Sequence, residues 1–336
     1  MASIRSAAVR PWRRAALGLV ALSAAAGLVL GDVSPAAASA RQASPRVTRV
    51  EITGFLRDRH GDIRRIAAPQ AEGSLTSNGQ EVSGTGASGM NDHGQIVGSY
   101  VAGGTRHGFL LDDGEYRTID VPGAISTAVN DINNRGEIVG IYTDRHGKGR
   151  GFVRSRRGRF TTISVPGSFS TGPHRINDRG QVAGVYSDVD NAGQPVRTGH
   201  GFIWDHGRFT RFDAPGNGPL TDPAGIDNRG TVVGAYDDAD GVTHGFLRTR
   251  RGRFVTIDLP GAVFTSPVSI NDRGDIVGQT GTADELAALA AHGFLLRRGR
   301  LDADATTLID VPDFPLVAAA DIDSRGRIVG YAYRAS

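Results

Sequence analysis

The chain has 336 residues, no cysteine and 47 glycines, and its 38 basic and 35 acidic side chains give a net charge of +3. Four arginines and one aspartate lie in the first 40 residues, so the rest of the chain has 34 basic and 34 acidic side chains. A neutral body lacks the basic footprint that nucleic acid or an anionic membrane would require. Without disulfides, the fold must be stabilised by burial alone.

Residues 1–40 have the pattern of a secretory signal peptide. An arginine-containing start is followed by the 16-residue apolar run Ala15–Leu30 and by the small residues Ala38-Ser39-Ala40 of a cleavage site. The apolar run is too short to span a bilayer comfortably. We therefore expect an exported, secreted protein without an integral membrane segment after cleavage. Residues 41–48 are then a short linker, and residues 49–336 form a single domain.

The rest of the chain consists of six copies of one sequence motif. The first half of the motif reads Ile-Asn-Asp-Arg-Gly-x-Ile-Val-Gly, and the second half reads His-Gly-Phe-Leu, a turn, and a β-prone stretch that ends at Pro-Gly. The first halves are Met90–Gly98, Ile132–Gly140, Ile176–Gly184, Ile226–Gly234, Ile270–Gly278 and Ile322–Gly330. The second halves are Thr53–Pro69, His107–Gly123, Arg150–Gly167, His200–Gly216, His244–Gly261 and His292–Pro312. A period of 42 to 54 residues indicates a repeat architecture.

One copy of the motif predicts four short antiparallel strands. In the second copy these strands are Thr127–Ile132, Glu137–Tyr142, Gly151–Arg154 and Phe160–Val165. Asn-Asn-Arg-Gly between the first two strands is typical of a type I turn with a glycine bulge. Proline ends the fourth strand because it cannot continue the ladder.

The two ends of the repeat predict how the fold closes. The first copy lacks its first half and the last copy lacks its second half, so Val50–Ile66 and Ala318–Ala332 together complete one unit. We expect an all-β fold, a six-bladed β-propeller of four-stranded antiparallel blades, in which the N-terminal third and fourth strands pair with the C-terminal first and second strands. An open β-solenoid is the alternative, but it needs polar caps at both ends, and none is seen.

Loop lengths point to one face of the ring. The turns within each hairpin are short and uniform, whereas the connections between second and third strands and between copies vary. Three insertions stand out: the loops Gln70–Ser88 and Ser187–Thr198, and Gln279–Ala291, where Thr282 and Glu285 form a capping box that predicts a short helix. Strand polarity places both variable connections on the same face, which is the expected working face.

The repeat resembles the HAF family of probable extracellular repeats. That family has an Ile-Asn-x-x-Gly-x-Val-Val-Gly half and a His-Ala-Phe-Leu half, whereas glycine follows the histidine here, as in His107-Gly108-Phe109. Pro-Gly also replaces the usual Leu-Gly-Gly. The resemblance covers nearly all of Val50–Tyr333 and implies an exported, β-propeller-like protein. It implies no activity and no catalytic residue.

Two sets of repeated polar residues are candidates for chemistry. Histidines at one repeat position could surround a metal; they are His107, His200, His244 and His292. Thr53 and Arg150 occupy that position in the other copies, and third strands lie far from the axis, so a structural role is favoured. The turn residues Asp92, Asp178 and Asp272 suit local hydrogen bonding within tight turns.

Tyrosines and loop carboxylates are the remaining candidates. Tyr100, Tyr142, Tyr186 and Tyr236 recur two residues after the repeated glycine and are candidate ligand-binding residues, with packing between blades as the alternative. Two neighbouring loops carry the candidate calcium ligands Asp188 and Asp190, and Asp237, Asp238 and Asp240. Neither loop fits the twelve-residue calcium pattern, so solvated turns are favoured, and Ca²⁺ is the only cofactor that the sequence suggests.

The sequence assigns no catalytic residue. It contains no zinc spacing, phosphate loop or local nucleophile–histidine–acid motif, although such a group could assemble across blades. It favours an exported, monomeric binding or interaction module for an extracellular protein or glycan. The alternative is a secreted hydrolase or lyase that uses Asp and His residues at the channel mouth. A structural protein of the cell wall or matrix is the third class.

Overall fold

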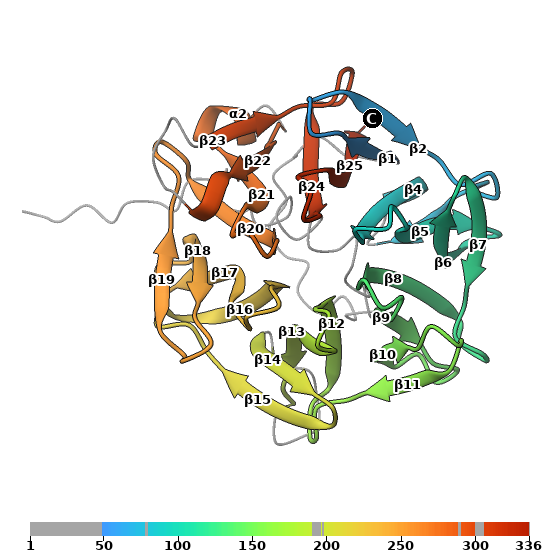
Figure 1. Cartoon of the computed structure of the whole chain (residues 1–336), viewed down its shortest axis with the longest axis horizontal. Coiled ribbons are helices and arrows are strands. Elements are labelled where there is room, and N and C mark those ends of the chain that lie inside the picture. The colour runs from blue at the N-terminus through green and yellow to red at the C-terminus, as the bar shows by residue number, and fades with distance from the viewer. Residues whose placement is uncertain are drawn as a thin grey trace, which may run out of the picture.

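The computed structural model describes residues 49–335 except for 78–79, 190–195, 197, 288–289 and 300–305. The predicted signal peptide and linker lie outside these residues. Within them the chain forms β-sheets that stand around a central axis (Figure 1), with two short helices, α2 (Ala283–Ala287) and η1 (Arg297–Gly299). No helix in the described part of the chain is long and apolar enough to cross a membrane.

Four of the sheets are separate blades of four antiparallel strands. The first two are β8 (Ser126–Ile132), β9 (Ile138–Thr143), β10 (Gly149–Arg154) and β11 (Phe160–Ile163), and β12 (Ser170–Ile176), β13 (Gln181–Ser187), β14 (His200–Asp205) and β15 (Arg208–Phe212). The next two are β16 (Asn217–Ile226), β17 (Val232–Asp238), β18 (Thr243–Arg248) and β19 (Phe254–Ile257), and β20 (Phe264–Ile270), β21 (Ile276–Gly281), β22 (His292–Leu296) and β23 (Thr306–Ile309). Each blade is one copy of the repeat, from its first strand at the axis to its fourth at the rim.

The remaining strands form one nine-stranded sheet that joins the two ends of the chain. Its strands are β24 (Leu316–Ile322), β25 (Ile328–Ala335), β1 (Arg49–Arg57), β2 (Ile63–Ile66), β3 (Leu75–Ser77), β4 (Gln80–Met90), β5 (Ile96–Ala102), β6 (Thr105–Asp112) and β7 (Glu115–Ile119). Val50–Arg57 pairs antiparallel with Ile328–Ala335, the pairing expected between N-terminal and C-terminal strands.

The prediction of six separate blades is therefore wrong, since four are separate and the other strands are joined. Arg49–Ile52 of β1 runs parallel to Glu81–Gly84 of β4, and this pairing fuses the sheet. The stretch predicted as the loop Gln70–Ser88 instead supplies β3 and the start of β4. Gly84 permits the close approach: its φ is +103°, and a Cβ there would stand 2.0 Å from the Ile52 carbonyl oxygen.

Each copy of the motif buries one phenylalanine completely. The six side chains, 0–1 % exposed, are Phe55, Phe109, Phe152, Phe202, Phe246 and Phe294. The glycine that ends Ile-Val-Gly makes room for this ring, because a Cβ on Gly140 would lie 2.1 Å from the Ala128 carbonyl oxygen and 2.8 Å from Phe152. A Cβ on Gly151, which precedes Phe152, would lie 2.4 Å from Pro173 of the next blade. Close packing between blades thus explains why glycine, and not alanine, precedes the phenylalanine.

The innermost strand of every copy has a β-bulge at the same place. The residues left out of the pairing are Ser88, Asn130, His174, Ala224, Val268 and Ala320. A bulge bends the strand and redirects a side chain. These six residues line one cavity on the axis, so the bulges build the channel wall.

The predicted helix in Gln279–Ala291 is confirmed as α2. The Thr282 backbone N–H donates to Glu285 Oε2 at 2.7 Å, and the Glu285 N–H donates to Thr282 Oγ1 at 3.3 Å, which is the capping box.

Candidate functional site in the central channel

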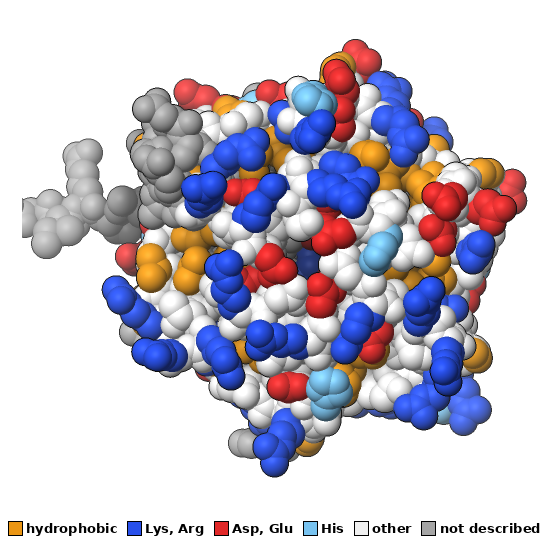
Figure 2. Space-filling view, in the orientation of Figure 1, with side chains coloured by type: hydrophobic (Ala, Val, Ile, Leu, Met, Phe, Trp, Pro, Cys, Tyr) orange, Lys and Arg blue, Asp and Glu red, His pale blue; other side chains and the backbone are white. Residues whose placement is uncertain are grey.

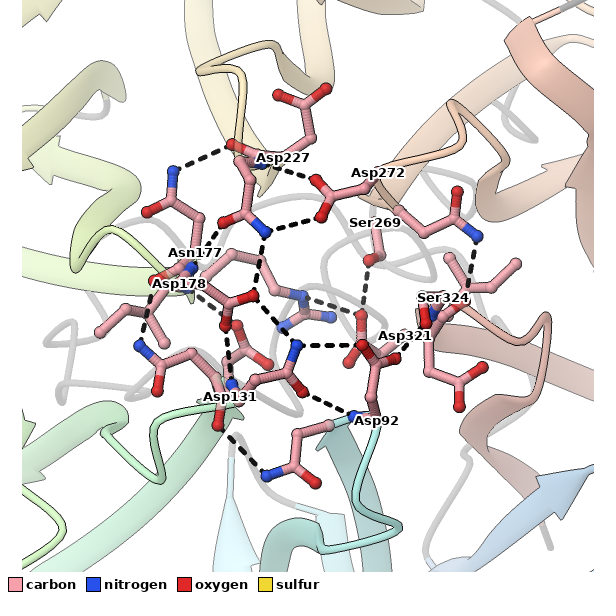
Figure 3. A pocket seen from close by; sticks show the side chains of 18 of the residues that line it. Asp92, Asp131, Asn177, Asp178, Asp227, Ser269, Asp272, Asp321 and Ser324 are labelled. Carbon is pink, nitrogen blue, oxygen red and sulfur yellow. Dashed lines mark hydrogen bonds and ion pairs between the residues drawn. The ribbon is translucent and has the colours of Figure 1, made fainter.

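The turns between first and second strands meet at one end of the channel, the turn mouth, and form a hydrogen-bonded belt (Figure 3). The second residues of the six turns make the belt: Asp92, Asn134, Asp178, Asn228, Asp272 and Ser324. The Asn134 backbone N–H donates to Asp178 Oδ1 at 2.8 Å, and its side-chain amide donates to Asp92 and Asp178, both at 3.0 Å. Three carboxylates thus alternate with two amides and with Ser324 around the mouth, and each amide separates two negative charges.

The belt corrects the expectation that these turn residues form local hydrogen bonds. The first residue of each turn does so instead: Asn133 Oδ1 accepts the backbone N–H groups of Arg135 and Glu137 at 3.0 and 2.9 Å. The second residue connects neighbouring copies, which chain order alone cannot reveal.

A second ring of hydrogen bonds lies beside the belt. The Asn133 amide donates to the Asn177 carbonyl oxygen at 3.0 Å, and Asn91, Asn177 and Asn271 make the equivalent bond. Aspartates occupy this position in the other two copies, as Asp227 and Asp323, and as carboxylates they cannot donate. A neighbouring guanidinium replaces each missing amide: Arg229 Nη2 donates to the Asp272 carbonyl oxygen at 2.9 Å, and Arg327 Nη2 to the Asn91 carbonyl oxygen at 3.5 Å.

Beneath the belt, three buried charged groups close the channel. Asp131, Arg175 and Asp321 are 5 %, 9 % and 6 % exposed. Arg175 donates to the Asn130 carbonyl oxygen at 3.2 Å, and its Nη2 reaches across the channel to the Ala320 carbonyl oxygen. Figure 2 shows the turn mouth as a hollow rimmed by acidic side chains, with basic side chains farther out. The cluster fills the axis and prevents an open pore.

The two carboxylates in this cluster are buried and accept hydrogen bonds from backbone N–H groups of neighbouring copies. Asp131 Oδ2 accepts the Ile176 N–H at 2.8 Å, and Asp321 accepts the Met90 N–H at 2.8 Å. Burial and the charge of Asp321 raise the pKa of Asp131 to about 7, against the opposing effect of Arg175. One guanidinium therefore faces two carboxylates, of which one takes up a proton near neutral pH.

On the other side of the bulges, toward the variable loops, the channel continues as a cavity that we call the axial chamber. Its space is about 650 Å³ when the part open to solvent is included. The chamber is lined by the six bulge residues and by Arg175, Asp222, Ala235, Ser266, Gln279, Ala319 and Tyr331. Its wall combines small apolar side chains with a group of polar ones, which are Ser88, Asn130, His174, Arg175, Asp222, Ser266 and Gln279.

The polar group has acceptors without partners. Asn130 Oδ1, His174 Nε2 and Asp222 Oδ1 are buried and have no hydrogen-bond partner within the described ranges. His174 Nδ1 lies 3.2 Å from the Pro223 carbonyl oxygen and 3.1 Å from Asp222 Oδ1, so Nδ1 carries the proton and Nε2 is the acceptor of the neutral ring. Although Asp222 is close enough to His174 for an ion pair, its Oδ1 makes no well-aligned hydrogen bond. Buried polar atoms normally have partners, so these three mark a site for a ligand or ordered water.

The four candidate tyrosines do not meet at a common site. Tyr100, Tyr186 and Tyr236 are 5–8 % exposed. The Tyr100 hydroxyl is 2.9 Å from Thr118 Oγ1 of its own copy, and the equivalent bonds of Tyr142 and Tyr236 to threonine are 3.2 Å. These hydroxyl bonds lie within single sheets, whereas the rings of Tyr186 and Tyr236 belong to clusters that also contain residues of the preceding blade, which is the alternative of packing between blades.

The repeated histidines are far from one another and are held by carboxylates. His107, His200, His244 and His292 each pair through Nδ1 with the aspartate that follows the fourth strand, at 2.8 Å in His107–Asp120. Burial alone would lower the pKa of His244, but the carboxylates of Asp258 and Asp238 outweigh it and raise the pKa. The sequence itself indicates this pairing, because histidine and aspartate occur together. The two copies without the histidine also lack the aspartate and have Ser164 or Ala67 in its place.

The candidate calcium ligands have other partners. Asp188 lies 3.2 Å from His200 Nε2, Asp237 accepts the Thr243 hydroxyl at 2.8 Å, and Asp238 caps its turn by accepting the backbone N–H groups of Asp240 and Val242. Asp190 lies outside the described residues. The described part of the chain contains no group of three or more His, Asp or Glu side chains that could hold a metal.

Sequence reasoning missed the channel residues because two local irregularities hide them. The bulge shifts each first strand by one residue, so simple alternation misplaces Asn130 and His174. On the second strand, the residue directly after the repeated glycine lines the chamber in three copies, as Ala235, Gln279 and Tyr331 do. The candidate tyrosines lie one position later and point to the opposite face of the sheet.

Four-stranded antiparallel blades around a closed axis define a β-propeller. No protein-family model and no curated protein matches the chain. Among solved structures it is similar to a protein assigned as TolB from Agrobacterium tumefaciens, with a TM-score of 0.57 and 12 % identity over 85 % of this chain and 99 % of that chain. TolB from Acinetobacter baumannii gives a TM-score of 0.48 and 13 % identity over 84 % of this chain and 63 % of that chain. At these identities the likeness establishes the propeller fold alone.

Proposed function

We propose that this protein is an exported, ligand-binding β-propeller whose ligand enters the axial chamber from the variable-loop side. The observation that carries the proposal is the set of three buried acceptors, Asn130 Oδ1, His174 Nε2 and Asp222 Oδ1, that line one cavity without a partner. Leaving such atoms unpaired costs about 1–3 kcal/mol each, so a ligand that pairs them gains affinity. A rigid, closed ring also preorganises the site, which lowers the cost of binding.

Three finer assignments belong to this proposal. We take the nine-stranded sheet as two blades fused at β1 and β4, which makes six blades in all; six buried phenylalanines, one per repeat, support this count. We assign the repeat to the HAF type on its two-part motif. Export rests on the signal-peptide pattern of residues 1–40.

A second candidate function is a hydrolase or lyase that uses the same chamber. His174 has its Nδ1 beside Asp222 and its Nε2 directed into the cavity, as a general base requires. The described chamber lining offers no nucleophile held by this histidine, because Ser88 and Ser266 have no hydrogen bond to it. Binding is therefore the better supported of the two.

The experiment is a ligand screen on the purified protein, read by thermal stabilisation and confirmed by calorimetry. A ligand of the chamber should lose affinity in Asn130→Ala and Asp222→Asn, whereas Asp240→Asn, an exposed loop change, should bind normally. Ligands that bind all three variants equally would exclude the chamber. Turnover of a bound ligand that His174→Gln abolishes would favour the enzyme instead.

A further inference from the structure

We infer that the axial chamber takes a protonated primary amine, as carried by an alkylamine or an amino sugar. This inference rests on the proposed binding function and names the chemical class of its ligand. It follows from the kind of polar atom left unpaired, from the balance of charge around the chamber, and from the side chains of its wall.

Acceptors outnumber donors among the unpaired buried atoms of the chamber, because its lining has three such acceptors and one such donor, Arg175 Nε, which lies 3.8 Å from Asp321 Oδ1. Asn130 uses its amide to donate to the Pro173 carbonyl oxygen at 2.7 Å, so its Oδ1 can only accept. Asp222 Oδ1 accepts because it is a carboxylate oxygen, and His174 Nε2 accepts in the neutral ring, whose proton lies on Nδ1 beside the Pro223 carbonyl oxygen and Asp222. A primary ammonium has three N–H donors and no acceptor, which matches three acceptors in one cavity. Asn130 is 3 % exposed, so water from bulk does not freely satisfy it.

The charges around the chamber favour a cation. The guanidinium of Arg175 already faces Asp131 and Asp321, and its Nε is 3.8 Å from Asp321 Oδ1. Within the described residues, the His174 imidazole is the one ion-pair partner of Asp222, and a neutral imidazole does not offset the negative charge of this carboxylate. Asp237 is 8 % exposed and lies near Asp222. Burial raises the pKa of Asp237, and the charges of Asp238 and Asp222 raise it further. A cation at Asp222 would relieve this repulsion.

The wall of the chamber selects a primary over a quaternary ammonium. Its apolar side chains are the small residues Ala224, Ala235, Ala319 and Ala320, with Val268 and one aromatic ring, Tyr331. Quaternary ammonium ions are recognised by cages of several aromatic faces. A single ring among alanines provides no such cage, whereas alanine walls accept a short carbon skeleton behind an N–H donor.

The test is calorimetry on the purified protein with probes that differ in one property. n-Butylammonium and glucosamine supply the amine on an alkyl and on a sugar skeleton, and 1-butanol, glucose, tetramethylammonium and acetate are their controls. We expect at least one of the two amines to bind at least about tenfold more tightly than every control, since charge-assisted hydrogen bonds are the stronger ones. Binding of n-butylammonium alone identifies an alkylamine such as a lysine side chain, and binding of glucosamine alone identifies an amino sugar.

Variants separate the chamber from other sites. Asp222→Asn should weaken the amine about tenfold or more, and Asp240→Asn should leave it unchanged, while thermal unfolding verifies that each variant is folded. Glucose or acetate binding in the chamber in preference to both amines would overturn the inference and leave the binding function standing. A third outcome is that Asp222→Asn changes the affinity of none of the probes. The chamber then holds water only, and both the inference and the proposed binding function fail.

Discussion

Replacing Asp131 by asparagine should stabilise the protein at alkaline pH and have little effect at acid pH. Asp131 is buried at the axis, and its pKa is raised from 3.8 to about 7. Below pH 3.8 the carboxyl is protonated in both the folded and the unfolded chain, so it imposes no cost. As the pH rises to about 7, the unfolded chain ionises first and the free energy of unfolding falls.

The magnitude follows from the difference between the two pKa values. At 1.36 kcal/mol per pH unit, the interval from 3.8 to about 7 corresponds to about 4 kcal/mol above pH 7. The asparagine side chain in the Asp131→Asn variant does not ionise, and its oxygen can still accept the Ile176 N–H. We therefore expect Asp131→Asn to exceed the natural protein in stability by about 2–4 kcal/mol at about pH 8, and by less than about 1 kcal/mol at about pH 4.5.

Urea unfolding followed by fluorescence of Trp204, which lies half-buried in β14, measures both stabilities. Asp321→Asn is the second arm, because the charge of Asp321 contributes to the raised pKa and its removal should shift the pH dependence to lower pH. Asp313→Asn, whose side chain is 70 % exposed, is the control and should change neither curve. A stability difference between Asp131→Asn and the natural protein that is the same at both pH values would refute the reasoning.

Three further predictions concern the scaffold. Asn134→Asp should lower the free energy of unfolding by about 2 kcal/mol at about pH 8 and by less at about pH 4. The change removes the amide between Asp92 and Asp178 and leaves three carboxylates in a row. Equal losses at both pH values in urea unfolding would contradict this. Gly140→Ala should cost about 1–3 kcal/mol or more by thermal unfolding, because its Cβ would meet the Ala128 carbonyl oxygen at 2.1 Å. Gly147→Ala, which meets nothing within 4 Å but has φ +77°, should cost only the backbone strain of about 1–2 kcal/mol, and a larger loss than in Gly140→Ala would reject the packing argument. Deleting Asp321–Ser336 removes β25 and the end of β24 and exposes the edge of β1, so cooperative thermal unfolding should be lost; a truncated chain that melts like the full one would disprove ring closure.

The hydrophobic period and the turn residues were sufficient to predict the blades. Alternation along Glu137–Tyr142 and Phe160–Val165, with glycine turns between strands, specifies short antiparallel strands because these signals act within a few residues. The split first and last copies also predicted the pairing of β1 with β25. What the repeat could not reveal was the parallel contact of β1 with β4, since the sequence of Gln70–Ser88 reads as a flexible, Gly- and Ser-rich loop.

The candidate site depended on the tertiary structure almost entirely. Asn130, His174 and Asp222 are 92 residues apart at most and come from three copies, and nothing local in the sequence marks them as neighbours. The bulges that direct the first two into the channel break the alternation on which sequence reasoning relies.

By itself, then, the sequence determined the repeat, its strands and the pairing of its ends, because each depends on short-range patterns repeated along the chain. Only the closed ring decided which residues face the axis. Closure places the six innermost strands around one channel. In each of these strands, a bulge of one residue determines whether a side chain packs between sheets or lines the axial chamber.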